Sequence, residues 1–188
     1  MKDATKKDLA ISLRKLLLKK PLSKITIGEL SKEAEVNRQT FYYHFQDIMD
    51  LLYYATEKEG ERIVNQESFG NSFEEDFRFL LSLFKDSEPV VKNVHHCLDK
   101  RSSDLLLSAL LCSFVGYYVK KESEGIDTNE EIINKVTSFY THALSGVIQE
   151  FIRSSFQTNI ESVAKETSEI LRGNFRNSTL NLLNPCIN

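Results

Sequence analysis

Turn-forming residues are scarce in this chain, which has only 7 glycines and 3 prolines among 188 residues. A sheet-rich fold needs a turn after every short strand, and glycine and proline supply many of those turns. Apolar residues make up 41% of the chain and charged residues 27%, so the composition supports a buried core and excludes the disordered class. The sequence therefore predicts an all-α protein.

Charge is distributed unevenly along the chain, although the net charge is only −3. Residues 1–46 carry ten Lys/Arg and five Asp/Glu, a balance of +5, whereas residues 47–188 have a balance of −8. DNA phosphates attract a basic segment and repel an acidic one. The distribution is therefore typical of a nucleic-acid-binding domain attached to a domain that does not bind, with chance clustering as the alternative.

Helical periodicity divides residues 1–46 into three helices. Apolar residues recur at helical spacing over residues 5–20. Thr26 followed by Glu29 is a capping-box pattern, which predicts a second helix from residue 27, and Asn37 is a favourable N-cap for a third. Two short helices joined by a tight turn and braced by a longer helix form a helix-turn-helix motif. We therefore predict a DNA-binding domain over residues 1–46.

The predicted third helix, residues 38–45, has one apolar face and one face rich in hydrogen-bond donors. Phe41 and Phe45 lie one turn apart, which directs both towards the first two helices. No acidic residue stands between Asn37 and Gln46. Arg and Gln can make bidentate contacts to base edges, and aromatic side chains can pack on thymine methyl groups. The alternative is that this face packs on another protein. We predict base contacts by Arg38, Gln39, Tyr42 and Tyr43, and phosphate contacts by Thr26, Thr40 and His44.

Residues 47–188 are predicted to form a helical regulatory and dimerisation domain that begins with a long linking helix from residue 47. Further helices are expected at residues 73–86, 89–98, 103–122, 130–154 and 160–171. The Asn-rich tail after Gly173 is expected to fray. The helix at residues 103–122 is apolar nearly all round. A membrane-spanning helix needs about 20 apolar residues, and the uncharged stretch of this helix is shorter. We therefore expect it in the middle of this domain and expect no membrane partner.

The helices at residues 130–154 and 160–171 carry a wider apolar stripe than packing within one small domain can cover. Small residues on the first of them allow another helix to approach closely. We therefore predict a homodimer in which these helices pair with their copies, so that two third helices meet a palindromic operator in double-stranded DNA. The predicted interface residues are Phe139, Ala143, Gly146, Val147 and Ile170.

A candidate effector pocket is predicted in the second domain, because small-molecule sites form between helices of such bundles. Its aromatic residues at helical spacing are more often typical of an ordinary core than of a ligand site, and the sequence leaves both interpretations open. The candidate lining residues are Phe77, Leu81, Phe84 and His95.

The common motifs for catalysis and cofactor binding are missing from the sequence. The chain has no GxGxxG, GxxxxGK[ST], HExxH or GxSxG, so we expect no enzyme activity and no cofactor. Adjacent residues on a helix point about 100° apart, so His95, His96 and Cys97 cannot bind one metal ion without remote partners, and no metal is expected. The cysteines, Cys97, Cys112 and Cys186, lack CxxC spacing, and the first ten residues are charged, which favours the cytoplasm.

Residues 26–52 resemble the TetR family of bacterial transcriptional regulators. The residues that carry the resemblance are Ile25, Thr26, Ile27, Leu30, Ala34, the stretch VNRQTFYYHF at residues 36–45, Leu51 and Leu52. The resemblance implies an N-terminal three-helix DNA-binding domain and a variable helical domain for dimerisation and signal sensing. The family commonly has a phosphate-contacting lysine at the start of the fourth helix, where this chain has Ile48.

Within that family, the chain is similar to the branch associated with regulation of dihydroxyacetone kinase genes. The matching residues are TFYYHF at residues 40–45, Phe139, Tyr140, Ala143, Gly146, Phe151 and Ile152. This similarity implies control of such an operon, as repressor or activator, with a signal from a small molecule or a kinase-like partner protein. The competing hypothesis is a helical adaptor that binds a protein partner without DNA, and an all-α enzyme is the third.

Overall fold

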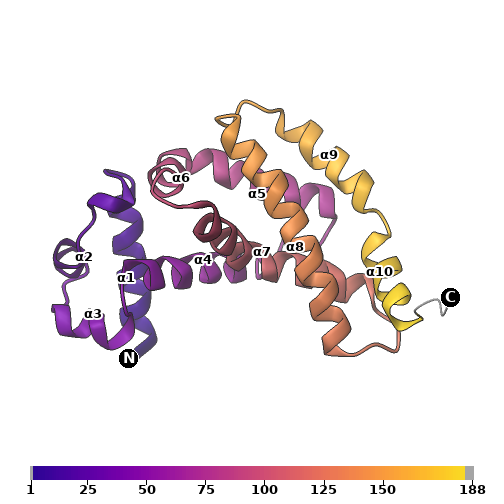
Figure 1. The fold of residues 1–188 in the computed structure, drawn as a ribbon, viewed down its shortest axis with the longest axis horizontal. Coiled ribbons are helices and arrows are strands. Elements are labelled where there is room, and N and C mark those ends of the chain that lie inside the picture. The colour runs from indigo at the N-terminus through magenta and orange to yellow at the C-terminus, as the bar shows by residue number, and fades with distance from the viewer. Residues whose placement is uncertain (1, 185–188) are drawn as a thin grey trace. The chain divides into compact units, whose positions relative to one another are not determined.

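The structure is a computed structural model that describes residues 2–184, and side chains from residue 4 onward. Every regular element within these residues is helical, which confirms the predicted all-α fold (Figure 1). The elements are α1 (Lys2–Leu17), the short 3₁₀ helix η1 (Leu22–Lys24), α2 (Ile27–Glu33), α3 (Arg38–His44), α4 (Ile48–Val64), α5 (Phe73–Asp86), α6 (Glu88–His95), α7 (Lys100–Glu122), α8 (Glu130–Arg153), α9 (Ile160–Leu171) and α10 (Asn174–Leu183).

Residue contacts divide the chain into two compact units. The first contains the chain up to Glu59 together with Ser87–Leu106, and the second contains Gly60–Asp86 and the chain from Leu107 onward. Helices α4 and α7 therefore each supply residues to both units. These units are defined by packing, so the predicted functional boundary between residues 46 and 47 stays a prediction.

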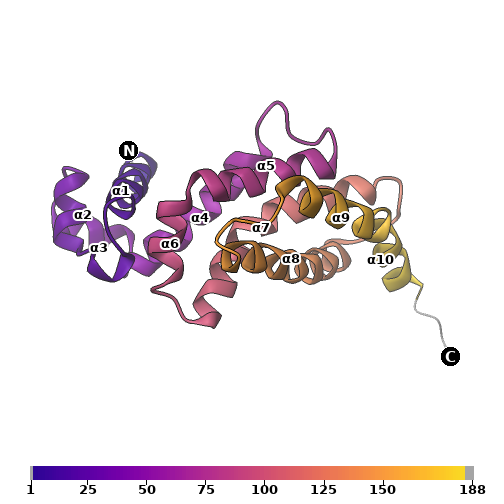
Figure 2. The same cartoon turned by 90° about the horizontal axis from the view of Figure 1, so that it is seen from above.

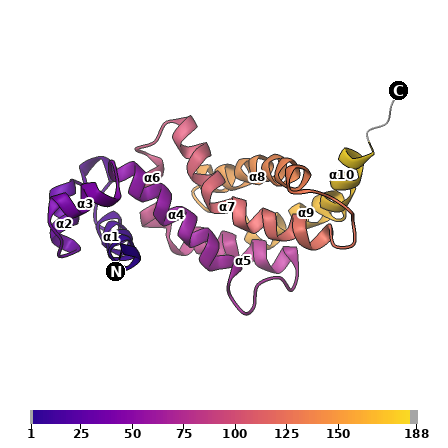
Figure 3. The same cartoon turned by 90° about the horizontal axis from the view of Figure 1, so that it is seen from below.

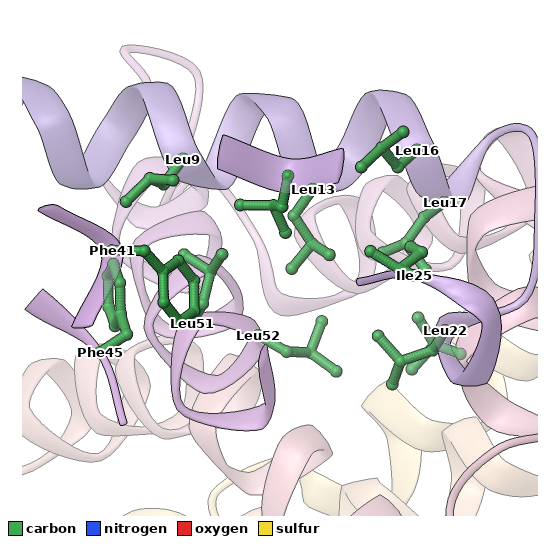
Figure 4. Packing of buried hydrophobic residues seen from close by; sticks show 12 residues of the cluster. Leu9, Leu13, Leu16, Leu17, Leu22, Ile25, Phe41, Phe45, Leu51 and Leu52 are labelled. Atoms are coloured by element: carbon green, nitrogen blue, oxygen red, sulfur yellow. The ribbon is translucent and has the colours of Figure 1, made fainter. Parts of the chain in front are cut away.

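The leucines of α1 form the centre of the first unit. Figure 4 shows Leu9 and Leu13 on the side of α1 that faces Phe41 and Leu51, and all four side chains are buried in one apolar cluster. Full burial of such a side chain stabilises the fold by about 1.5–3 kcal/mol. Burial of these leucine side chains therefore stabilises the packing of α3 and α4 against α1.

Helices α2 and α3 begin at the predicted caps. The Thr26 Oγ1 accepts the Glu29 N–H at 3.2 Å and the Glu29 Oε2 accepts the Thr26 N–H at 3.1 Å, which confirms the capping box. The Asn37 Oδ1 accepts the Thr40 N–H at 2.7 Å. Between the helices, Glu35 has a φ of 55°, a left-handed conformation that a non-glycine residue adopts only at a cost. This residue makes the tight turn of the predicted helix-turn-helix motif.

Helix α6 packs in the first unit although it lies far along the chain. The Asn93 Nδ2 donates a hydrogen bond of 2.8 Å to the carbonyl oxygen of Leu17, the last residue of α1. Val94 is buried in the same apolar cluster as the α1 leucines. The first unit is therefore built from two separate segments of the chain.

Helix α7 supplies buried residues to the centre of the second unit, as its apolar pattern predicted. Leu111, Phe114 and Val119 are buried, and the Phe114 ring lies 5.7 Å from that of Phe73, between ring centroids. Among the described helices, α7 is the one long and apolar enough to cross a membrane by length and composition. Its buried aromatic contacts favour a core helix, because core helices have the same composition.

The second unit places α9 along α5 and α10 against α8 and α9 (Figure 2). Figure 3 shows α7 beside α8, and a Cβ added to Gly116 of α7 would lie 3.7 Å from the Thr137 methyl group of α8. This is an ordinary van der Waals distance, so α7 and α8 lie close together here with room for a methyl group at Gly116.

Helix α10 corrects the expectation that the tail after Gly173 frays. Gly173 has a φ of 72°, which turns the chain, and Phe175 is buried with its ring 4.7 Å from the Tyr140 ring. The Tyr140 hydroxyl also donates a hydrogen bond of 3.1 Å to the carbonyl of Asn174. The Asn-rich segment is held in place by Phe175 against α8 and by the buried Thr179, whose hydroxyl lies 3.0 Å from that of Ser123 after α7.

Candidate nucleic-acid interface

Helix α3 turns its donor-rich face away from the core of the first unit. Phe41 and Phe45 are buried, whereas the side chains of Tyr42 and Tyr43 are 59% and 66% exposed. Arg38 and Gln39 are exposed as well. The helical phase predicted for α3 is therefore confirmed, and all four predicted base-contacting residues are accessible.

The predicted phosphate contacts Thr40 and His44 lie along another edge of α3 and are half-buried. The Thr40 hydroxyl donates to the Asn37 Oδ1 at 3.0 Å. A hydroxyl group has one hydrogen to donate, so contact with a phosphate requires Thr40 to leave this partner. The His44 ring lies edge-on to the Tyr43 ring, with 5.0 Å between centroids.

The first turn of α2 combines the Thr26 capping box with a neighbouring charge pair. The Thr26 hydroxyl donates to the Glu29 Oε2 at 3.0 Å, and the Lys20 Nζ donates to the Glu29 Oε1 at 2.6 Å. The hydrogen bond from Lys20 is the largest cause that lowers the pKa of Glu29, followed by those from Thr26. The Thr26 hydroxyl is thus already engaged, and Lys20 offsets the negative charge of Glu29.

The Arg38 guanidinium lies against the first turn of α2. A Cβ added to Gly28 would be 2.5 Å from the Arg38 Nη2, closer than atoms normally approach. Gly28 therefore leaves the space that this long side chain occupies, at the border between the exposed face of α3 and the start of α2.

The predicted dimer residues form an exposed apolar strip in the second unit. The side chains of Phe139 on α8 and Ile170 on α9 are 69% and 70% exposed. Ala143 and Gly146 follow Phe139 at helical spacing and are exposed, and Val147 is half-buried. Exposed apolar side chains are compatible with the predicted interface, which stays a prediction.

The candidate effector residues do not belong to one unit. Phe77 and Leu81 are fully buried in the second unit, where the Phe77 ring stacks at 5.6 Å on the ring of Phe73. Phe84 is half-buried in the same unit, whereas His95 belongs to the first. Phe77 thus packs as a core residue, and the effector pocket stays a prediction.

Cysteine and histidine side chains do not gather in the part of the chain that the structure describes, since no three metal-type side chains cluster there. The Cys97 Sγ lies 3.5 Å from the Ser23 Oγ, and this hydrogen bond lowers the pKa of the Cys97 thiol. Cys112 is exposed and unbridged, and Cys186 lies outside the described residues.

Lys6 lies beside the C-terminal end of α3, and the sequence patterns did not predict a role for it. The Lys6 Nζ lies over the rings of Phe45 and Tyr54, at 5.7 and 5.2 Å from their centroids. Lys6 stands three residues before the buried Leu9, and this spacing was the available sign that it shares the side of α1 that faces α3 and α4.

Comparison with known proteins gives two matches to family models. Residues 12–55 match the model described as bacterial regulatory proteins of the tetR family, and residues 71–173 match the model of the TetR-type transcriptional regulator C-terminal region. The second match alone covers more than half of the chain.

A solved structure named "Dihydroxyacetone kinase operon activator DhaS" is similar in fold, with a TM-score of 0.55 and 16% sequence identity over 92% of this chain and 96% of that chain. The comparison with curated proteins gave no match. The exposed face of α3 and the matched N-terminal and C-terminal models lead to the same conclusion. The chain belongs to the TetR family of bacterial regulatory proteins and is a DNA-binding transcription regulator.

Proposed function

We propose that this regulator binds a palindromic operator as a homodimer and controls a dihydroxyacetone kinase operon. The observation that carries the DNA-binding part is the exposed, acid-free face of α3, which lies opposite the buried Phe41. The operon is supported by the name of the similar solved protein and by the branch resemblance.

Gln39 and Tyr43 are proposed to contact base edges, with Arg38 and Tyr42 beside them. All four are exposed, and Gln can make bidentate contacts to adenine while Arg makes them to guanine. In the free protein the Arg38 guanidinium lies against Gly28, so a base contact requires Arg38 to swing away from α2. Such a movement is compatible with the four rotatable bonds of an arginine side chain.

Thr26, Thr40 and His44 are proposed to hold phosphates on either side of the reading face. The capping box already uses the N–H groups of Thr26 and Glu29, so the backbone N–H groups between them are the donors expected at that point. Thr40 exchanges its hydrogen bond with Asn37 for one with a phosphate oxygen. Such contacts position the protein on the duplex without reading sequence.

Homodimerisation is proposed to use the exposed strip on α8 and α9, namely Phe139, Ala143, Gly146, Val147 and Ile170. A two-fold axis through this strip presents two copies of α3 to successive major grooves of a palindrome. The signal is proposed to reach the second unit from a small molecule or from a kinase-like partner protein. Residues Phe77, Leu81, Phe84 and His95 remain the candidates for contact with a small molecule.

A gel-shift experiment tests this function with DNA from upstream of the regulator gene and of dihydroxyacetone kinase genes. A shuffled duplex of equal length and composition is the control. We expect specific retardation that weakens steeply between about 50 and 200 mM salt, because bound lysines and arginines release counterions from the phosphates. If none of these DNA fragments is retarded, the chain is an adaptor without DNA binding. Retardation of another operator but not of the kinase DNA refutes only the proposed operon.

The direction of control follows from a reporter gene placed behind the retarded DNA. Expression that rises when the regulator is deleted identifies a repressor, and expression that falls identifies an activator. Addition of dihydroxyacetone or of the kinase subunits to the gel shift then distinguishes a small-molecule signal from a protein signal.

A further inference from the structure

The C-terminal end of α3 has a cation beside it that comes from a different helix. Phe45 ends α3, and its ring lies 5.4 Å from that of Tyr54 on α4, between centroids. The Lys6 Nζ of α1 lies over both rings, within the distance at which an ammonium group is attracted to an aromatic face. We call these two rings the aromatic seat of Lys6.

The aromatic seat does not pair Lys6 with an acidic side chain. Among the described side chains, no carboxylate forms an ion pair with it, whereas Lys15 and Lys20 of the same unit pair with Glu33 and Glu29. An aromatic ring attracts an ammonium group without cancelling its formal charge. A half-buried, oriented lysine also has less side-chain freedom to lose when it binds an anion.

The start of α4, which follows directly, is negatively charged. The Asp47 Oδ1 accepts the Asp50 N–H at 2.8 Å, and the Asp50 Oδ2 accepts the Gln46 N–H at 3.0 Å. The two carboxylates thus accept backbone N–H groups at the start of α4, and the half-buried Ile48 between them carries no charge. A phosphate near this end of α3 needs a cation from elsewhere, because the two carboxylates repel it.

We propose that Lys6 contacts a DNA phosphate at the C-terminal end of α3, and that Phe45 and Tyr54 are positioning residues that aim its ammonium group. The contact complements those proposed at Thr26 and Thr40, which lie towards the other end of α3, and it adds a second phosphate contact beside the one proposed at His44, the last residue of α3. This inference rests on DNA binding by α3 and is independent of which operon is controlled.

The test compares Lys6→Gln with Lys7→Gln, which removes the same charge from the next residue of α1. Lys7 is exposed, and it points about 100° away from Lys6 around the helix axis. The readout is fluorescence anisotropy of a labelled random-sequence duplex of about 30 bp titrated at salt concentrations from about 50 to 200 mM, because phosphate contacts are independent of sequence.

For a dimer, Lys6→Gln should lower the slope of log affinity against log salt by about two, one for each subunit. Between about 50 and 200 mM salt, the fold-loss of affinity of Lys6→Gln should then be about one tenth of that of the wild type. Lys7→Gln should change the slope by less than half as much, and Lys6→Arg, which keeps the charge, should retain the wild-type slope.

The aromatic seat has its own test. The Lys58 Nζ also lies over the Tyr54 ring, at 6.0 Å from its centroid, so both tyrosine variants are made in a Lys58→Gln background. There, Tyr54→Phe keeps the ring and should retain the slope of the Lys58→Gln parent, whereas Tyr54→Leu removes the ring and should lower the slope as Lys6→Gln does. Melting curves identify variants that fail to fold, and the slope is compared among folded variants.

A wild-type slope in folded Lys6→Gln overturns the proposal, as does an equal change in Lys6→Gln and Lys7→Gln. If the wild type binds no duplex, the DNA-binding function fails and the Lys6 contact fails with it. If it binds duplex DNA but not the kinase DNA, only the proposed operon fails.

Discussion

Gly146→Arg is the most direct test of the dimer proposed on α8. Gly146 lies on the same exposed strip as Phe139 and Ala143, at the point where we place the crossing of two copies of α8. A Cβ added to Gly146 meets nothing within 4 Å in the single chain. The substitution therefore adds a long charged side chain without a clash inside the subunit, so its effect on assembly can be separated from its effect on folding.

The expected changes in free energy have opposite signs for folding and for association. Glycine inside a helix is less favourable than alanine by about 0.5–1 kcal/mol, and arginine is a good helix former, so the isolated subunit should become slightly more stable. In a two-fold interface, the variant buries two guanidinium groups without partners, and each costs several kcal/mol of lost hydration. A loss of even about 4 kcal/mol raises the dimer dissociation constant roughly a thousandfold.

Sedimentation velocity measures this change, with Asn134→Arg as the matched control. Asn134 is exposed on α8, and twelve residues of helix place it about 120° around the axis from Gly146. We expect a monomer for Gly146→Arg, a dimer for Asn134→Arg, and unchanged helical content for both.

Operator affinity should be lost in Gly146→Arg although every DNA-contacting residue is intact, because a monomer presents only one α3. A Gly146→Arg protein that sediments as a dimer and binds its operator normally would refute this placement of the interface. Dissociation of both variants would show that added positive charge, and not its position, separates the subunits.

Three further predictions concern the first unit. Phe45→Ala should lower the free energy of unfolding by about 3–5 kcal/mol, whereas Tyr42→Ala should leave the melting curve nearly unchanged, and equal losses would contradict the helical phase of α3. Gln39→Ala should cost about 1–3 kcal/mol on the operator and little on random DNA, while Thr40→Ala should weaken binding to both in parallel titrations. Because the pKa of Glu29 is lowered in the folded state, its contribution to stability is present above the ordinary glutamate pKa and is lost as the pH falls through the lowered pKa. Melting temperatures between about pH 3 and 6 should therefore fall less steeply for Glu29→Gln than for the wild type.

Local sequence patterns predicted the DNA-binding motif well because its decisive contacts are local. The Thr26 capping box and the Asn37 cap join residues only three apart, and the inward direction of Phe41 and Phe45 follows from helical geometry alone. The exposed face of α3 could therefore be assigned before any tertiary contact was known.

Contacts between distant residues explain what the sequence could not predict. The order of α10 depends on Phe175 and Tyr140, and the Lys6 seat needs Tyr54, almost fifty residues further along the chain. No local pattern indicates either partner. The Asn-rich composition after Gly173 favoured a frayed tail, and the burial of Phe175 and Thr179 outweighed it.

The placement of α6 has a consequence for how the DNA-binding unit can respond. Asn93 of α6 donates to the carbonyl at Leu17, and Val94 is buried in the cluster that contains Leu13 and Phe41. Because protein cores are close-packed, a displacement of α6 must open a cavity in this cluster or move α1 with it. Phe41 anchors α3 to the same cluster, so the position of the reading helix depends on α6 as well as on its own sequence.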